Sequence, residues 1–161
     1  MRRTLYLISI VLLLFNVMKV NAQQAITEPR WLSSFELSEY KNKVVYLDFW
    51  ASWCVPCRES FPWLNEMQTK YQDQGLVVIA VNLDRDVNKA HQFVKKFPAS
   101  FYLFSDPKAE LAIKYKVTGM PSSYLFSIDG KLKETHIGFK KSEADKYEAN
   151  IVKLLAQSKQ Q

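Results

Sequence analysis

The feature that most constrains the fold of this chain is an apolar run that leads into a closely spaced pair of cysteines. The run extends from Val44 to Ala51, and Cys54-Val55-Pro56-Cys57 begins three residues after its end. Runs rich in β-branched and aromatic residues are typical of central strands that are buried on both faces. Helical spacing of apolar residues follows the cysteines, from Arg58 to Gln74. The sequence therefore predicts a strand, a C-x-x-C loop and a helix in direct succession.

The two cysteines, the only ones among 161 residues, form the candidate chemical centre. A loop of this length lets their sulfurs bond to each other, and a helix N-terminus stabilises a thiolate on the first cysteine. Cys54 is therefore the candidate nucleophile, and Cys57, a turn into the helix, is the candidate resolving thiol. Pro56 restricts the loop and suits a first helical turn.

Two other interpretations of this pair stay open: a structural disulfide and half of a metal site. A bridge that closes such a short loop removes little chain entropy, which argues against a purely structural role. His91 and His136 are the only histidines, and neither has the paired spacing of metal ligands. Thiol–disulfide exchange is the favoured interpretation, and we expect neither a metal nor a cofactor.

Residues 1–22 have the layout of a secretory signal peptide. Arg2 and Arg3 precede an apolar stretch from Leu5 to Met18, and Val20-Asn21-Ala22 offers a small-residue cleavage site. An uncleaved N-terminal membrane anchor is the alternative. We expect residues 23–161 to form one exported domain that works in an oxidising compartment, the bacterial periplasm or cell envelope.

The charge pattern favours no nucleic-acid partner. The formal net charge is +6, and about +3 remains without Arg2, Arg3 and Lys19. Lysines and acidic residues are interspersed along the rest of the chain, as is usual for a solvated surface. Because 48% of the residues are hydrophobic and two cysteines cannot form a disulfide scaffold, the fold must rest on packing. We expect a monomer.

Further along the chain, the apolar pattern predicts alternating strands and helices after an irregular lead-in at residues 23–43. The expected elements are a buried strand at 76–81, a helix from 84–86 to about 97, a short strand at 101–104, a helix after 106–107, a hairpin of strands 122–128 and 133–137, and a last helix that ends near 157. Ser142 with Asp145 resembles a capping box before the last helix. This order implies an α/β fold, a mixed central sheet with helices on both faces.

Taken together, these motifs resemble the thioredoxin superfamily, and more closely its secreted TlpA/ResA-like branch. The matching segments are Asp48 to Arg58 with the C-x-x-C, Phe61-Pro62, Thr118-Gly119-Met120-Pro121 and the hairpin that follows. The helix and strand between Leu83 and Asp106 match the insert that distinguishes this branch. The resemblance covers roughly residues 31–155, and it implies a thioredoxin fold with a TlpA-type helix–strand insert.

The resemblance also implies roles for residues around the cysteines. Asp48 is expected to lie beneath them and to take the proton from Cys57 during resolution. A bond from this acid to a backbone group or water is the alternative. The lysine that often neighbours the acid in thioredoxins has no counterpart, because Ala80 falls near its place. Pro121 matches a cis-proline that faces the C-x-x-C, so that the Met120 backbone can pair with an extended client.

The aromatic residues near the motif have simpler assignments. Trp50 and Trp53 are expected to pack around the loop, and Trp53 and Pro56 are candidates for contact with a client. The predicted core residues are Phe49, Phe61 and Phe126. The two histidines are predicted to lie on the surface.

The function implied is that of a thiol–disulfide oxidoreductase, a reductase of disulfides in client proteins. Val55-Pro56 resembles the loop of TlpA-like reductases more than that of strong oxidants, which often contains histidine. The family implies a membrane thiol relay of the DsbD or CcdA type as electron donor. The alternatives are reduction of apocytochrome c during cytochrome c maturation and a non-catalytic module that binds clients. Ser122-Ser123 stands where the haem-maturation subgroup often has an acid, which favours the broader reductase.

Overall fold

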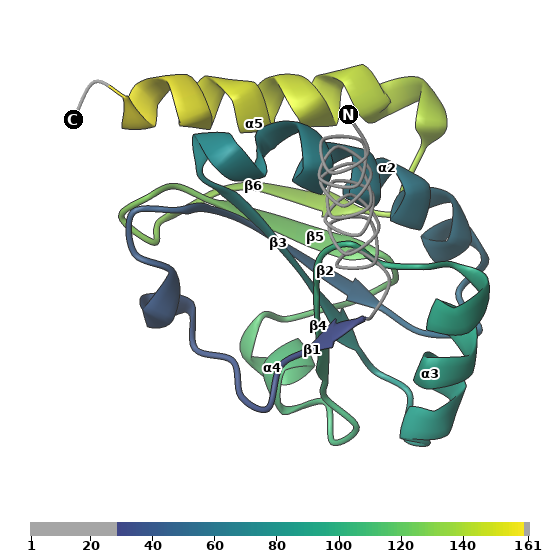
Figure 1. Ribbon diagram of the computed structural model, residues 1–161. Coiled ribbons are helices and arrows are strands. Elements are labelled where there is room, and N and C mark those ends of the chain that lie inside the picture. The colour runs from purple at the N-terminus through teal and green to yellow at the C-terminus, as the bar shows by residue number, and fades with distance from the viewer. Residues whose placement is uncertain (1–28, 160–161) are drawn as a thin grey trace, which may run out of the picture.

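The computed structural model describes residues 29–159, which form one mixed sheet with helices on both faces (Figure 1). The strands are β1 (Arg30–Trp31), β2 (Val44–Trp50), β3 (Leu76–Asn82), β4 (Tyr102–Ser105), β5 (Ser122–Phe126) and β6 (Leu132–Ile137). The helices are α2 (Val55–Tyr71), α3 (Val87–Lys96), α4 (Glu110–Lys114) and α5 (Ala144–Ser158), with 3-10 turns η1 (Leu37–Tyr40), η2 (Gln72–Gln74) and η3 (Lys141–Glu143). The predicted signal peptide, residues 1–22, lies outside the described residues.

The strand order β1-β4-β3-β2-β5-β6 places β2 near the centre of the sheet. The first four strands in this order run parallel, whereas β5 is antiparallel to both β2 and β6. The mixed sheet with a terminal hairpin predicted from the sequence is therefore confirmed. The predicted insert is also present, as helix α3 and strand β4. Within residues 29–159, no helix combines the length and the apolar character needed to cross a bilayer.

All seven residues of β2 are buried, which explains why the sequence shows a continuous apolar run instead of an alternation. Successive side chains still point to opposite faces of the sheet. Tyr46 and Trp50 enter a core shared with α2, α3 and α5. Leu47 and Phe49 enter a second core, which includes Ala112 of α4. The strand that leads to the cysteines is thus held rigidly from both sides.

Helix α2 begins at Val55, three residues before the predicted start at Arg58. The earlier start follows from Cys54, which serves as the N-cap, and from Pro56, which occupies the first turn. Proline is tolerated there because the N–H that it lacks would have no partner within the helix. Both cysteines are therefore fixed by the start of the helix.

Two local predictions are wrong. Residues 30–31, assigned to an irregular lead-in, form strand β1 and pair with β4, because a strand of two residues has no readable period. Ser142 does not cap the last helix. It lies in turn η3, and the N-cap of α5 is Glu143, which makes no side-chain capping bond.

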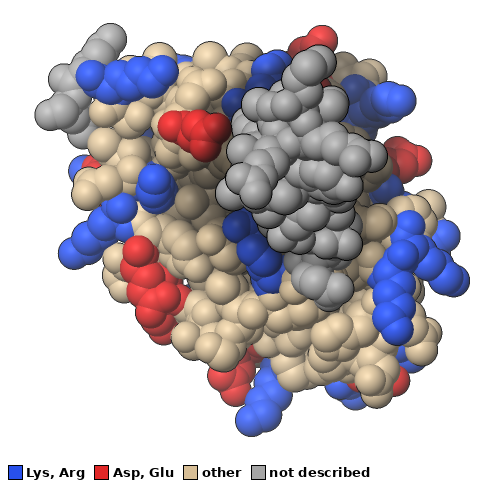
Figure 2. Space-filling model, viewed as in Figure 1, with Lys and Arg blue, Asp and Glu red and all other residues tan. Residues whose placement is uncertain are grey.

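The surface carries charges of both signs. On the face shown in Figure 2, lysine and arginine side chains are scattered among acidic ones. This distribution agrees with the interspersed charges of the sequence.

Candidate active site

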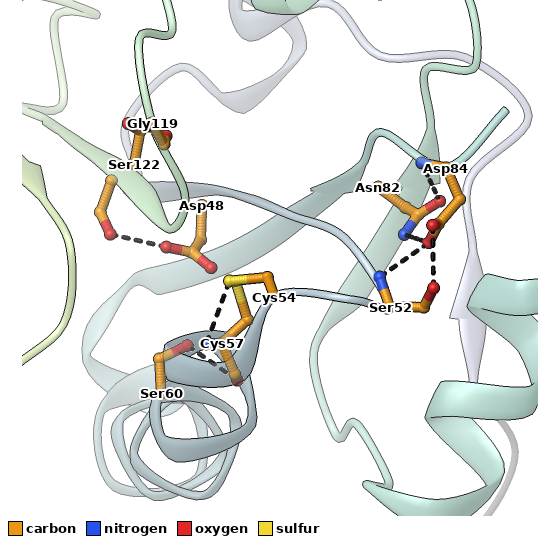
Figure 3. The surroundings of a disulfide bond; sticks show 10 residues. Asp48, Ser52, Cys54, Cys57, Ser60, Asn82, Asp84, Gly119 and Ser122 are labelled. Atoms are coloured by element: carbon orange, nitrogen blue, oxygen red, sulfur yellow. Dashed lines mark hydrogen bonds between the residues drawn. A yellow bond between two sulfur atoms is a disulfide. The ribbon is translucent and has the colours of Figure 1, made fainter.

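Cys54 and Cys57 are joined by a disulfide bond at the junction of β2 and α2 (Figure 3). The Sγ–Sγ distance is 2.00 Å and the two Cα atoms are 5.3 Å apart. Cys54 keeps 3% of its surface exposed and Cys57 keeps none. Cys54 is the more accessible of the two cysteines, as predicted, but in the disulfide form the difference in exposed surface between them is small.

The start of α2 points a donor at the Cys54 sulfur. The backbone N–H of Cys57 donates to Cys54 Sγ over 3.2 Å. The first N–H groups of a helix lack partners within the helix and carry the positive end of its dipole. A thiolate on Cys54 would therefore be stabilised at this position, which is the property required of an attacking sulfur.

Asp48 lies on the sheet face that α2 covers, and only 1% of its surface is exposed. In Figure 3 its carboxyl group points toward the disulfide. Ser123 Oγ donates to Asp48 Oδ1 over 2.6 Å, whereas Asp48 Oδ2 has no hydrogen-bond partner among the described residues. Ala80 pairs directly with Asp48 across β2 and β3, so the residue beside this acid on β3 is an alanine and carries no charge.

Burial sets the acidity of this carboxyl group. Loss of solvation raises the pKa of Asp48 to about 7, and the Ser123 hydrogen bond opposes the rise. Burial and the nearby Asp48 charge also raise the pKa of Tyr46, the neighbour two residues earlier on the same face. Asp48 can therefore hold or release a proton near neutral pH, as a general base for a buried thiol must.

A second buried carboxylate, Asp84, anchors the loop in front of the cysteines. Its oxygens accept hydrogen bonds from the backbone N–H and the hydroxyl group of Ser52, each over 2.8 Å. The Asn82 side chain donates to the same carboxylate over 2.8 Å and accepts from the Asp84 N–H over 3.0 Å. This network could not be predicted from the sequence, because Ser52 and Asp84 are far apart in the chain and meet only where β2 and β3 end side by side.

We expect Asp84→Ala to lower the free energy of unfolding by about 2–3 kcal/mol, because it leaves the buried Asn82 amide and two half-buried donors of Ser52 without an acceptor. Urea unfolding of the oxidised protein measures this loss. Asp73→Ala, which truncates an exposed acid in η2, is the control and should change stability by less than about 0.5 kcal/mol. A similar small effect for Asp84→Ala would show that the network does not hold the loop.

The peptide bond between Met120 and Pro121 is cis, as predicted from the resemblance. Pro121 is buried, and Met120 is half-buried. Met120 lines an open groove of about 530 Å³ together with Trp53, Leu83, Ile113 and other residues of α4 and the loop after it. The groove is mostly apolar and includes Trp53, the aromatic residue directly before Cys54.

The two tryptophans at the motif differ in placement. Trp50 is fully buried and contacts Phe61 and Phe93, so it is a core residue. Trp53 is 65% exposed and stands at the groove.

The core assignments of Phe49, Phe61 and Phe126 are confirmed. Among residues 29–159, no three histidine, cysteine or acidic side chains are grouped so that they could hold a metal ion.

The Redoxin family model matches residues 21–152 of this chain, which includes every residue of the site described above. The chain belongs to the Redoxin family. This membership, the cis Met120–Pro121 bond and the C-x-x-C pair confirm the thioredoxin-superfamily resemblance and the fold expected from it. As a Redoxin family member, the protein can be compared with characterised relatives.

Among curated relatives, the thiol-disulfide oxidoreductase ResA of Bacillus cereus strain ZK is 36% identical over 103 residues, which are 64% of this chain and 60% of the relative. ResA of Bacillus subtilis is 32% identical over 60% of this chain and 54% of its own length. The chain thus matches somewhat more than half of the length of these relatives.

Among solved structures, a Chlorobium tepidum protein with the provisional name thiol:disulfide interchange protein DsbE is 45% identical to this chain. The match covers 75% of this chain and 86% of that protein, with a TM-score of 0.74. StoA from Bacillus subtilis is 26% identical, with a TM-score of 0.60 and coverage of 68% and 82%. Both similarities agree with the fold, and the Chlorobium tepidum protein is one named for thiol–disulfide interchange.

Proposed function

We propose that this protein is a thiol–disulfide oxidoreductase that reduces disulfides of client proteins by cycling Cys54 and Cys57 between dithiol and disulfide. The observation that carries the proposal is the Cys54–Cys57 pair at a helix N-terminus, in a fold that also carries the cis Met120–Pro121 bond and an apolar groove lined by Trp53 and Met120. The names of the ResA relatives support the same chemistry. The predicted export of the chain assigns this activity to the bacterial periplasm or cell envelope.

The cycle begins with the reduced protein. The Cys54 thiolate attacks a client disulfide, forms a mixed disulfide and releases one client sulfur as a thiolate, which takes up a proton. Asp48 then accepts the proton of the Cys57 thiol, and the Cys57 thiolate attacks the Cys54 sulfur. The second client sulfur leaves, and the Cys54–Cys57 disulfide forms. Two electrons pass from the protein to the client in each cycle.

The client segment is proposed to lie in the groove beside Trp53 and Met120. An extended segment can pair with the Met120 backbone as an added strand, while its apolar side chains contact the groove. Pro121 contributes no N–H to this site, so it places no free donor beside the sulfurs. Recognition through backbone bonds and apolar contacts suits a protein that acts on several clients.

Renewal of the dithiol requires an electron donor outside the cytosol. We propose a membrane thiol relay of the DsbD or CcdA type, which would reduce the Cys54–Cys57 disulfide after each turnover. A narrower function, reduction of apocytochrome c, is the second candidate. Ser122, a neutral residue, follows the cis-proline and favours the broader range of clients.

Equilibration of the protein with dithiothreitol and glutathione redox buffers tests the direction of electron flow. Because the loop residues Val55 and Pro56 add no cationic neighbour for the Cys54 thiolate, we expect a midpoint near the thioredoxin value of about −270 mV. Reduction of insulin in the same buffers provides the activity readout. A midpoint near the value of strong oxidants, about −120 mV, would contradict the reductase assignment. A disulfide inert to dithiothreitol would contradict the redox function itself.

A further inference from the structure

His136 is more buried than the sequence predicted, and its placement is unusual. The surface position expected for it is wrong: the residue is half-buried, and its ring lies against the Tyr147 ring of α5 at a centroid distance of 4.6 Å, with the ring planes tilted by 50°. Nε2 of the ring is buried and has no hydrogen-bond partner among the described residues. Burial lowers the pKa of His136, so the imidazole is neutral near pH 7 and can accept a proton.

The register of the sheet connects this histidine to Asp48. Asp48 of β2 pairs with Ser123 of β5, and Ser123 pairs with His136 of β6. Directly paired residues point to the same face of a sheet, with Cβ atoms roughly 4.5–5.5 Å apart. The three side chains therefore form one polar row under α2 and α5, which runs from the site beside the disulfide to the edge strand β6.

The other direction along the same row is apolar. Asp48 pairs with Ala80 of β3, and Ala80 pairs with Leu103 of β4. Neither side chain can carry a proton. Only 1% of Asp48 is exposed, so a proton that it takes from Cys57 needs another way to solvent.

Ser123 can continue the row beyond Asp48. A hydroxyl group has one donor and two acceptor lone pairs. Ser123 Oγ already uses its donor on Asp48 Oδ1, and after Asp48 is protonated the hydroxyl group can turn, accept from the carboxyl group and donate toward β6. His136 is the residue paired with Ser123 on that side, and its buried Nε2, which has no hydrogen-bond partner among the described residues, is an acceptor in the Nδ1–H tautomer.

We propose that Asp48, Ser123 and His136 form a proton path from the carboxyl group beside the disulfide to the solvent at strand β6. The proposal rests on the proposed role of Asp48 in the dithiol–disulfide cycle. In each cycle, protonated Asp48 gives its proton to Ser123 Oγ while the Ser123 hydroxyl proton passes to His136 Nε2, directly or across one water molecule. The imidazolium that forms releases a proton from Nδ1 to solvent, so that Asp48 is again ionised and His136 is again neutral, now with its proton on Nε2. Tautomerisation of the neutral ring, with water as the proton carrier, restores the Nδ1–H form before the next cycle.

The groups that face His136 are compatible with this exchange. Glu134, on the same strand, favours the charged imidazole, and so does Glu143 of η3. Lys146 of α5 disfavours the charged imidazole. The Tyr147 ring packs on the imidazole without adding charge. Burial, the largest influence, keeps His136 neutral until it receives a proton. His136 acts on the cysteines only through Asp48 and is a positioning and proton-transfer residue.

Nitrogen NMR of the full domain tests the path without any activity measurement. In a pH titration, the Nε2 chemical shift of His136 should show two inflections, one from the imidazole itself and one near pH 7 from Asp48. Asp48→Asn and Ser123→Ala should each remove the second inflection. Ser122→Ala is the matched control, because the Ser122 hydroxyl donates to the Gly119 carbonyl over 2.7 Å and makes no bond to Asp48. A single His136 inflection that none of these variants changes would overturn the path.

Kinetics provide a second readout. His136→Gln keeps a polar side chain but cannot take up a proton, so resolution of a mixed disulfide should slow at low buffer concentration and recover when imidazole is added. His91→Gln, which changes an exposed histidine on α3, should leave the rate unchanged. If His136→Gln matches the wild type at every buffer concentration while Asp48→Asn slows resolution, the path is wrong and the proposed function stands. If the wild type fails to reduce any disulfide, the function fails, and the NMR titration still decides the path.

Discussion

Cys54→Ser should reduce insulin reduction roughly 10³-fold or more, because it removes the sulfur that forms the covalent intermediate. A serine hydroxyl at the helix start is not ionised near pH 7 and cannot attack a disulfide. The fold should survive, because a serine oxygen can cap α2 in place of the Cys54 sulfur that now accepts from the Cys57 N–H. Turnover and the far-ultraviolet circular dichroism of the variant measure both expectations.

Cys57→Ser is the matched control for this substitution. Its Cys54 thiolate can still attack, but no second sulfur can resolve the mixed disulfide, so clients should stay covalently bound to Cys54. Mass spectrometry of the trapped species would identify the clients. Normal turnover in Cys54→Ser would contradict the assignment of Cys54 as the nucleophile, and trapping of clients on Cys57 in that variant would show that the roles of the two cysteines are reversed.

Asp48→Asn should slow the resolution step by about 10²-fold, the usual contribution of a general base. The rate in the wild type should rise with pH through about 7, the pKa of Asp48, because only the carboxylate can accept the Cys57 proton. Stopped-flow measurement of resolution across this range provides the profile. Attack by Cys54 on a small disulfide is the internal control and should change little, since that step does not require removal of the Cys57 proton. A profile without the inflection would contradict the assigned base.

The same substitution should change how stability depends on pH. The pKa of Asp48 is 3.8 as a free side chain and about 7 in the folded protein, so between these values the folded protein holds a proton that the unfolded chain has lost. Stability is therefore full below about pH 4 and falls by roughly 4 kcal/mol as the pH rises through 7. Asp48→Asn should remove this slope and unfold at higher denaturant concentration at pH 8. If the stability of the wild type and of Asp48→Asn changed with pH in the same way, the pKa of Asp48 would not be raised in the folded protein.

The parts of the fold that depend on local pattern could be predicted from the sequence. Strand β2 was readable because burial on both faces leaves an uninterrupted apolar run. The cis-proline was predicted from its place in the motif and not from any local preference, since most bonds before proline are trans. Strand β1 was missed because its only structure comes from pairing with β4, seventy residues away.

The parts of the site that depend on strand register could not be predicted. In the sequence, Ser123 is only a serine two residues after the proline, and the residues next to it in the chain do not reveal that β5 places it beside Asp48. His136 lies in a strand of mostly exposed residues, so its sequence context is that of a surface position. Ser52 and Asp84 meet because two parallel strands end at the same edge. A prediction of these contacts would require the pairing of each strand as well as its location.

The capping of α2 by Cys54 has a consequence for the fate of a bound client. The helix N-terminus makes Cys54 a good leaving group as well as a good attacking one, since a departing thiolate is stabilised there. A mixed disulfide can therefore revert, with the client sulfur expelling Cys54, or go forward through Cys57. The forward branch is the one that needs Asp48 to remove a proton. The fate of a bound client thus depends on the relative rates of two steps: release by reversal, which the helix dipole favours, and resolution by Cys57, which Asp48 favours. Acidic surroundings protonate Asp48 and would therefore favour release.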